Sequence, residues 1–230
     1  MRWLTAMALV ALACPVFAQQ NEAEKLFRAM EKQVKESKTI KVGFDVDADL
    51  GKAAAAKLKG SLVVAPGNKA RLDAKGTFEG KERSVLMLAD GKQQLYSENN
   101  EPAKPRALEF DISTVVPQIL ARGGVFAMFE TAPDKKDAFD IDKFLPATDF
   151  KLGAREKVGA REAQPVQYTL KPGPDRLVQV TVWLDLKTNV PLKRVLVGTN
   201  PDKQMITVTE TYTEIALNPA VEDKIFEMPK

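Results

Sequence analysis

Two long parts of this chain alternate apolar and polar residues with a period of two, and this alternation restricts the possible folds more than any other feature. The first part begins with apolar residues at every second position, namely Ile40, Val42, Phe44, Val46 and Ala48. The second part, from about Phe150 onward, includes PVQYTL, LVQVTVWLDL and QMITVTETYTEIAL. Because successive side chains of a strand point to opposite faces, such strands have one apolar and one wet face. Both parts are therefore predicted to form antiparallel sheet.

Turn signals divide each part into consecutive strands. Pro66–Gly67–Asn68 ends one alternating run, and Asp90–Gly91 is a strong signal for a two-residue hairpin. Near the C-terminus the stretch QVTVWLDLKTNVPLKRVLV places a turn at Asp185–Asn189 between two strands. A tryptophan in a strand most often packs in a core, but the alternation places Trp183 on the more polar face of its strand.

Helical segments lie before and between the two sheet-forming parts. Asn21 and Glu24 have the spacing of a capping box, and the residues behind them predict an amphipathic helix over Glu22–Ser37. Its apolar face is formed by Ala23, Leu26, Phe27, Met30 and Val34. The phenylalanine-rich middle of the chain contains the short helix ISTVVPQILARGG, which Gly123–Gly124 closes. This order of elements predicts an α+β fold with helices gathered on one face of an antiparallel sheet.

The N-terminus has the pattern of a secretory signal. Met1–Arg2 is followed by the apolar run WLTAMALVALA, and VFA at Val16–Ala18 supplies the small residues of a cleavage site. We expect residues 1–18 to be removed and residues 19–230 to form a single, soluble, periplasmic domain. A second interpretation is that Cys14, the only cysteine, is lipidated and anchors the protein. Cleavage after Ala18 would leave no disulfide, so that stability must come from an ordinary core.

The composition argues against several classes of chemistry. The chain has no histidine, which removes Ser-His-Asp and Cys-His catalysis, histidine metal sites and the commonest general base. The sequence contains no G-x-S-x-G elbow, P-loop or dinucleotide-binding glycine pattern. The formal charge of the full chain is only +3 and its basic residues are scattered, so nucleic acid is not an expected partner. We expect neither a cofactor nor enzyme activity.

Two groups of acidic residues are the remaining candidates for a polar site. The densest stretch comprises Asp134, Asp137, Asp140 and Asp142. It lacks the loop glycine and the distal glutamate of an EF-hand, so we interpret it as solvated charge on a short helix. Glu210 and Glu214 lie on one face of the last long strand at period two. They could act as paired carboxylates in acid–base chemistry, but we interpret them as partners of opposing lysines on a wet sheet face.

Several stretches resemble the periplasmic outer-membrane lipoprotein carrier (LolA-like) superfamily. They are AEKLFRAMEKQVKESKTIKVGFDVDA, GSLVVAP, LMLADGKQQLYS, VWLDLKTNVPLKRV and ITVTETYTEIALNPAVEDKIFEMP. The resemblance follows the order of elements over nearly the whole chain after residue 18. It implies a strongly bent antiparallel sheet, an incomplete β-barrel, whose concave face is covered by helices and encloses an apolar cavity for acyl chains. Trp183 would then lie on the convex side or at an edge.

The resemblance also implies a lipid-binding site on the inward strand faces and the middle helices. The residues that periodicity assigns to it are Ile40, Val42, Phe44, Leu62, Val64, Leu86, Leu88, Val116, Ile119, Leu120, Phe126 and Phe129. The opposite strand faces remain an alternative. The segment Ile112–Phe129, with a hinge at Gly123–Gly124, is predicted to be a movable cover over the cavity. A fixed core helix is the alternative for this segment.

The resulting hypothesis is a monomeric periplasmic carrier that binds acyl chains of lipids or lipoproteins for transport toward the outer membrane. Donor and acceptor proteins at the two membranes are further partners that the resemblance suggests. One departure weakens the case for lipoprotein transfer: the well-studied carriers have an arginine before the proline that ends the second strand, whereas this chain has Ala65 before Pro66. Arg71 lies beyond the turn and is not equivalent. The alternative function is an envelope sensor or interaction protein with the same fold, lipid-anchored through Cys14.

Overall fold

The structure is a computed structural model that describes residues 14–51, 54–130, 139–173, 176–199 and 203–229. Within these residues, twelve strands form one antiparallel sheet. The first half of the chain supplies β1 (Ile40–Gly51), β2 (Ala54–Ala65), β3 (Lys69–Phe78), β4 (Lys81–Asp90), β5 (Gln93–Glu98) and β6 (Arg106–Ala107). The second half supplies β7 (Ala147–Leu152), β8 (Glu156–Val158), β9 (Arg161–Gly173), β10 (Arg176–Asp185), β11 (Pro191–Thr199) and β12 (Met205–Leu217).

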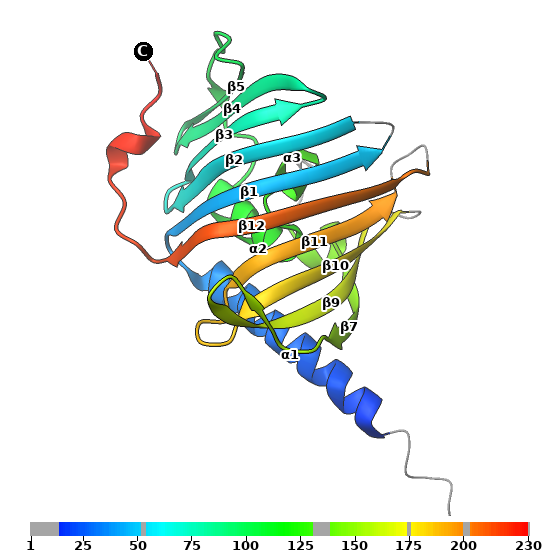
Figure 1. The fold of residues 1–230 in the computed structure, drawn as a ribbon. Helices are drawn as coiled ribbons and strands as arrows, with labels where there is room; N and C mark the ends of the chain where they lie inside the picture. Colours follow the sequence, from blue (N-terminus) through cyan, green and yellow to red (C-terminus); the bar gives the residue numbers. More distant parts are fainter. Residues whose placement is uncertain (1–13, 52–53, 131–138, 174–175, 200–202, 230) are drawn as a thin grey trace, which may run out of the picture.

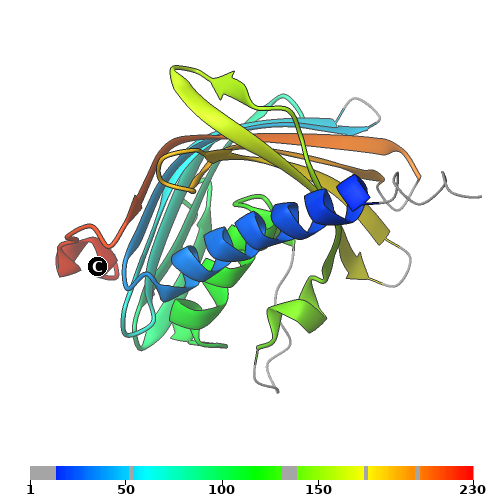
Figure 2. The same ribbon diagram turned by 90° about the horizontal axis from the view of Figure 1, so that it is seen from below.

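The sheet is strongly bent but not closed. Its order is β6-β5-β4-β3-β2-β1-β12-β11-β10-β9-β7, and β8 pairs with β9. The two alternating parts of the sequence therefore meet in the middle, where β1 pairs with β12, and their outer strands β6 and β7 form the two edges of the path. Figure 1 shows the strands side by side, and Figure 2 shows how they curve around the helices. The expected α+β fold with an incomplete barrel is confirmed.

The helices occupy the concave side of this sheet (Figure 2). They are α1 (Cys14–Glu36), α2 (Ile112–Gly123), α3 (Ala127–Glu130) and α4 (Ile141–Phe144), and a 3₁₀ turn, η1 (Asp223–Phe226), lies outside it. Among the described residues, no helix is both long enough and apolar enough to cross a membrane.

Helix α1 docks by the face that the sequence indicated. Phe27 and Met30 are fully buried, and Val34 is nearly so. The ring of Phe27 lies 4.5 Å from that of Tyr168 in β9 and 5.1 Å from that of Phe150 in β7. Leu26 is only partly buried at the margin of this core. The helix extends back to Cys14, beyond the predicted start at Glu22.

The hairpin of β10 and β11 shows which face of the sheet is wet. Val180, Val182 and Leu184 belong to the main core. Trp183 lies on the opposite, convex face, where its Nε1 donates a hydrogen bond to Glu156 of β8 and Lys193 Nζ lies 4.8 Å from the ring centroid. The predicted placement of Trp183 outside the apolar face is confirmed.

The C-terminal segment packs on the same convex face (Figure 1). Phe226 of η1 forms a small second core with Val63 and Ala65 of β2. Arg71 of β3 donates a hydrogen bond of 3.0 Å to the carbonyl oxygen of Ile225. Arg71 thus secures the C-terminal segment outside the sheet, away from the helices on the concave side.

Candidate functional site

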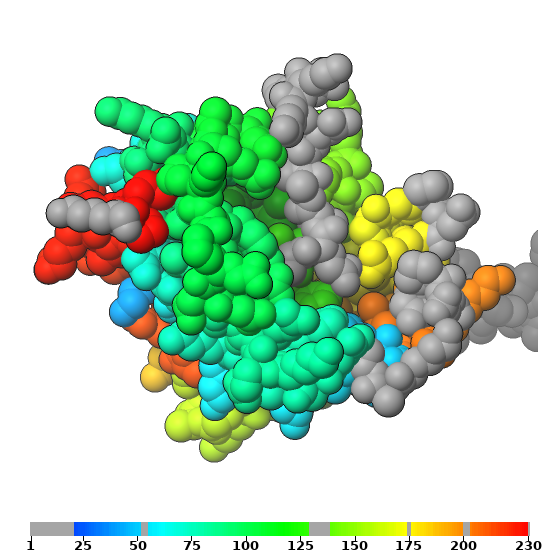
Figure 3. Space-filling model, turned by 90° about the horizontal axis from the view of Figure 1, so that it is seen from above, coloured from blue at the N-terminus to red at the C-terminus, as the bar shows by residue number. Residues whose placement is uncertain are grey.

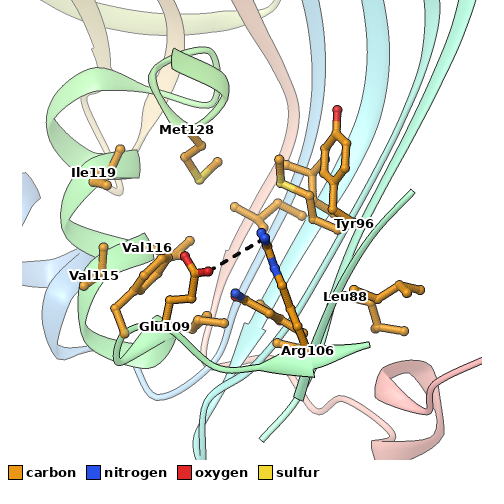
Figure 4. Close-up of a pocket in the computed structure, with 17 residues that line it drawn as sticks. Leu88, Tyr96, Arg106, Glu109, Val115, Val116, Ile119 and Met128 are labelled. Carbon is orange, nitrogen blue, oxygen red and sulfur yellow. Dashed lines mark ion pairs between the residues drawn. The ribbon is translucent and has the colours of Figure 1, made fainter. Parts of the chain in front are cut away.

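A cavity of about 230 Å³ lies between α2 and the strands β2–β5. Its apolar lining comes from both sides: Leu62, Ala70, Leu72, Met87, Leu88, Ala89, Leu95, Phe110, Ile112, Val115, Val116, Ile119 and Met128. Its polar lining is Gln94, Tyr96, Arg106 and Glu109, which we call the polar edge. Figure 4 shows Val116 and Ile119 on α2 facing across the cavity toward the strands. In the space-filling view a recess opens beside the green segments of the chain, which include α2 (Figure 3).

The N-terminal end of α2 is fixed to the turn that follows β2. Asp111 caps the helix by accepting a hydrogen bond of 3.1 Å from the backbone N–H of Thr114. Ser113 Oγ donates to the carbonyl oxygen of Ala65 at 3.2 Å and accepts from the N–H of Asn68 at 2.8 Å. The N–H of Ser113 in turn donates to Asn68 Oδ1 at 3.3 Å. We call these last three bonds, which all involve Ser113, the Ser113 latch.

The C-terminal end of α2 is held by a buried cluster of Arg194, Glu210 and Tyr212. Arg194 on β11 donates to the carbonyl oxygens of Leu120 at 3.0 Å and Ala121 at 2.7 Å, two of the last four carbonyl groups of the helix. The carbonyl oxygen of Leu120 also accepts a hydrogen bond of 3.1 Å from the backbone N–H of Gly124. Arg194 Nη1 also donates to the Tyr212 hydroxyl at 3.0 Å. The cluster therefore ends the helix at a fixed position on the sheet.

Glu210 completes this cluster and corrects the interpretation made from the sequence. Its side chain is 0% exposed, and its carboxylate accepts hydrogen bonds from the backbone N–H of Val125 at 3.1 Å and of Phe126 at 2.6 Å. The Tyr212 hydroxyl donates to the same carboxylate, and Arg194 Nη1 lies 3.9 Å from it. The prediction of a wet-face residue paired with a lysine was wrong for Glu210.

The same prediction holds for Glu214, which pairs with Lys41 at 2.9 Å on the outer face. Glu210 and Glu214 lie on opposite faces because the register of β12 against β1 shifts between the pairs Phe44–Tyr212 and Gly43–Glu214. Such a bulge inserts one residue and reverses the inward–outward alternation beyond it.

Gly124 allows the close approach between the end of α2 and this cluster. Its backbone has φ 84° and ψ −171°, a conformation that is essentially restricted to glycine. A Cβ atom at this position would collide with the carboxylate of Glu210 and the guanidinium of Arg194. Gly124 is therefore required for packing at the predicted hinge.

A second buried arginine links three helices. Arg122 of α2 donates to Glu31 of α1 at 2.6 Å and to Asp142 of α4 at 2.7 Å. The hydrogen bond from Arg122 lowers the pKa of Asp142. The Tyr168 hydroxyl donates to the carbonyl oxygen of Arg122 at 2.7 Å, and burial raises the pKa of Tyr168 to about 12. These bonds connect α1, α2, α4 and β9.

Only part of the predicted acidic stretch can be placed. Asp140 caps α4 through the N–H of Asp142, whereas Asp134 and Asp137 lie outside the described residues. Asp142 is largely exposed, as expected, but it also binds the buried Arg122. No group of three or more potential metal-ligating side chains occurs in the part of the chain that the structure describes.

The residues predicted to bind lipid fall into several groups. Leu62, Leu88, Val116 and Ile119 line the cavity. Five others lie in the main core, namely Ile40, Val42, Phe44, Val64 and Leu120. Phe126 borders a smaller cavity of about 50 Å³ near β9–β12. Leu86 is half-buried on β4, and the side chain of Phe129 is outside the described residues.

Sequence reasoning missed several residues that line the cavity. Met87 lies on β4, where the neighbouring positions of the opposite parity were chosen. Tyr96 on β5 is the cross-strand partner of Met87. Counting outward from the hairpin turn at Asp90–Gly91 could have placed these two residues side by side. Arg106 and Glu109 lie in a segment without periodicity, so no pattern in the sequence indicates them.

The comparisons with known proteins concern the fold. LprF from Mycobacterium bovis has a similar structure, with a TM-score of 0.51 and 12% sequence identity over 87% of this chain and 97% of LprF. The LolA superfamily protein NE2245 from Nitrosomonas europaea gives a TM-score of 0.38 at 11% identity, over 90% of this chain and 97% of NE2245. A chain of the Pseudomonas aeruginosa MucA/MucB complex gives 0.40 at 15% identity, over 90% of this chain and 61% of that one. No protein-family model and no curated protein sequence matches the chain.

Proposed function

We propose that this chain, which has a fold similar to that of LprF, is a non-enzymatic binding protein that takes acyl chains of lipids or lipoproteins into the cavity beneath α2. The observation that carries the proposal is the cavity itself, which is lined by aliphatic side chains on both walls and has its polar groups at one edge. Burial of acyl methylene groups against such a lining contributes ~0.8 kcal/mol for each CH₂. The apolar lining therefore supplies the driving force for binding.

The proposed site of action is the periplasm. The apolar N-terminal run and the VFA stretch support export with removal of residues 1–18, and residues 19–230 would form the single lipid-binding domain. In this role the protein carries its lipid toward the outer membrane. Mass spectrometry of the mature N-terminus tests the export step: a start at Gln19 supports a free carrier, and an acylated Cys14 supports an anchored protein instead.

We also propose that α2 opens over the cavity at its N-terminal end. The two ends of the helix are held by different contacts, the Ser113 latch at the start and buried Arg194 and Glu210 at the end. Three hydrogen bonds near the surface are easier to break than a fully buried charged cluster. The cover would therefore pivot about its C-terminal end and admit the ligand beside Ser113.

A binding experiment with a matched pair of variants tests the proposed function. Native mass spectrometry of protein purified from the cell envelope should detect bound lipid. Val116→Phe adds bulk inside the cavity and should abolish this binding, whereas Val195→Phe makes the same change on β11 outside the cavity lining and should leave it intact. The proposal is wrong if no lipid co-purifies and a dansyl-labelled fatty acid also fails to bind, or if both variants bind as the parent protein does.

A further inference from the structure

The sheet side of the cavity contains two adjacent rows of directly paired residues. One row has large side chains and comprises Leu62 of β2, Leu72 of β3, Met87 of β4 and Tyr96 of β5. The neighbouring row has small side chains, because Ala70 of β3 pairs with Ala89 of β4. Cross-strand partners lie side by side on one face of a sheet, so both rows cross the strands. The two alanines therefore leave a groove beside the larger row, and this groove also crosses the strands.

The two ends of the groove differ. On β5 it ends at Tyr96, which is 45% exposed, and at Gln94, the partner of Ala89. On β2 it ends at Leu62, which is buried. Val42 of β1 pairs with Leu62 on the far side and is fully buried in the main core. The groove is thus open and polar on β5, and closed and apolar toward the middle of the sheet.

Tight packing continues beyond Leu62. Phe44 of β1 lies against Gly60 of β2, where an added Cβ atom would come within 2.7 Å of the phenylalanine ring. Phe44 is buried, and Leu120 of α2 belongs to the same core. A chain that lies in the groove with its head group on β5 therefore has to end at Leu62.

The width of four strands sets the length of chain that fits. Neighbouring strands lie about 4.8 Å apart, so about 14 Å separate the positions of Tyr96 and Leu62. An extended hydrocarbon chain advances about 1.25 Å for each carbon, given bonds of ~1.5 Å at nearly tetrahedral angles. A chain of about twelve carbons therefore reaches from the open end of the groove to its closed end.

The size of the cavity restricts the number of chains. Its volume of about 230 Å³ lies below the range of about 300–1,000 Å³ typical of pockets for small-molecule ligands. Helix α2 closes the groove on the side away from the sheet, and Figure 4 shows Val116 and Ile119 across the cavity from Tyr96. One chain can lie between these two walls, whereas two or three chains would need a much larger cavity.

From these observations we infer that the ligand is an amphiphile with one unbranched acyl chain, and that Leu62 limits this chain to about twelve carbons. The methyl end of the chain lies against Leu62, and the head group lies outside, beyond Gln94 and Tyr96. A lipid with several chains can insert only one of them. This inference rests on the proposed function, because it specifies the ligand of the same cavity.

Displacement of a dansyl-labelled fatty acid by lysophosphatidylcholines tests the inference. The probes share one head group and carry decanoyl, lauroyl, myristoyl or palmitoyl chains, each used below its micelle concentration. Affinity should rise about fourfold for each added CH₂ as far as the lauroyl chain, and then level off because further carbons stay in water. Dihexanoyl phosphatidylcholine divides the same number of acyl carbons between two chains. It should bind about a hundredfold or more weakly than the lauroyl probe, because only one short chain is buried.

Substitutions at the closed end should move the limit in opposite directions. Leu62→Ala lengthens the groove by about two carbons, so the myristoyl probe should bind it about tenfold more tightly than the lauroyl probe does. Leu62→Phe fills the same end, and affinity should level off before the lauroyl chain. Leu184→Ala is the matched control, because it removes the same atoms from a core position on β10 that does not line the cavity. It should leave the limit at the lauroyl chain.

The possible contrary results contradict different statements. An affinity that keeps rising to the palmitoyl chain would overturn the length limit. Equal affinity for the dihexanoyl and lauroyl probes would overturn the single chain, and both results would leave acyl binding intact. A limit that neither substitution of Leu62 moves would show that Leu62 is not the closed end. Binding of neither the probes nor the dansyl-labelled fatty acid would contradict the proposed function itself.

Discussion

The two ends of α2 lie in different surroundings. The difference shows how one sheet can leave a cavity beside some of its strands and pack tightly against a helix at others. Toward β2–β5 the helix faces aliphatic residues such as Leu72 and Met87, and a cavity remains between them. Toward β11 and β12 the end of the same helix meets Arg194 and Glu210, whose hydrogen bonds hold it close to the sheet, and the cavity near these strands is much smaller, about 50 Å³. Buried polar groups require partners in defined directions, whereas aliphatic side chains tolerate a gap. Polar contacts therefore fix the helix, and apolar contacts leave room for a ligand.

The largest effect on stability is expected from removing a side chain from the tightly packed core between α1, β7 and β9. Phe27→Ala removes a fully buried ring that packs on Phe150 and Tyr168, and it should reduce the free energy of unfolding by about 3–5 kcal/mol. Phe78→Ala is the control, because Phe78 is exposed at the end of β3 and its loss should have an effect within about 0.5 kcal/mol. Urea unfolding measures both. An unchanged midpoint for Phe27→Ala would show that α1 is not docked as described.

The buried charges of Arg194 and Glu210 provide the second test, at the tightly packed end of α2. Arg194→Met leaves the carboxylate of Glu210 buried without its cation, and the free energy of unfolding should fall by about 3–5 kcal/mol. Lys41→Met breaks the exposed pair with Glu214 and should lower it by at most about 1 kcal/mol. The double variant Arg194→Met, Glu210→Gln should be more stable than Arg194→Met alone. If the two single variants are equally stable, the cluster does not hold α2 in place.

Two glycines with positive φ sharpen the comparison between a filled and an open environment. Gly67 has φ 77°, and a Cβ atom added there would meet nothing within 4 Å, so Gly67→Ala should lower the free energy of unfolding by about 1–2 kcal/mol through backbone strain alone. Gly124→Ala adds a collision with Glu210 and Arg194, which should increase the loss to about 3 kcal/mol. Thermal unfolding of both variants gives the difference. Equal losses would mean that the end of α2 can move away from the cluster without penalty.

The sequence predicted the sheet well because alternation is a direct consequence of strand geometry. The strands on both sides of Asp90–Gly91 and the convex position of Trp183 follow from that pattern. The assignment of Glu210 and Glu214 to one wet face was wrong for Glu210, because the bulge between Tyr212 and Glu214 reverses the faces there and leaves no mark in the sequence. Alternation also does not indicate how closely a helix approaches the sheet, so Val42 in the closed core and Leu62 at the cavity were predicted alike. The polar edge lies in irregular chain, where no periodicity applies.

The smallest effect on stability, and the most direct test of opening, is expected at the Ser113 latch. Ser113→Ala removes the hydroxyl that joins α2 to Ala65 and Asn68, at a cost of about 1 kcal/mol in the free energy of unfolding. Because the other end of α2 stays bound to Arg194, the loss should appear as local opening rather than global unfolding. Amide hydrogen exchange should therefore accelerate at the start of α2 and remain slow near Leu120.

A second serine serves as the control for the latch. Ser37 donates to the carbonyl oxygen of Gln33 at 2.8 Å near the end of α1, so Ser37→Ala removes a hydroxyl of the same type without touching α2. It should leave exchange in Ile112–Phe129 unchanged. A saturating lauroyl ligand should alter exchange in that segment in the parent protein, because the cover must close over an occupied cavity instead of an empty one. If exchange is slow and neither Ser113→Ala nor the ligand changes it, α2 is a fixed part of the core. Ligands would then reach the cavity past the polar edge without movement of the helix.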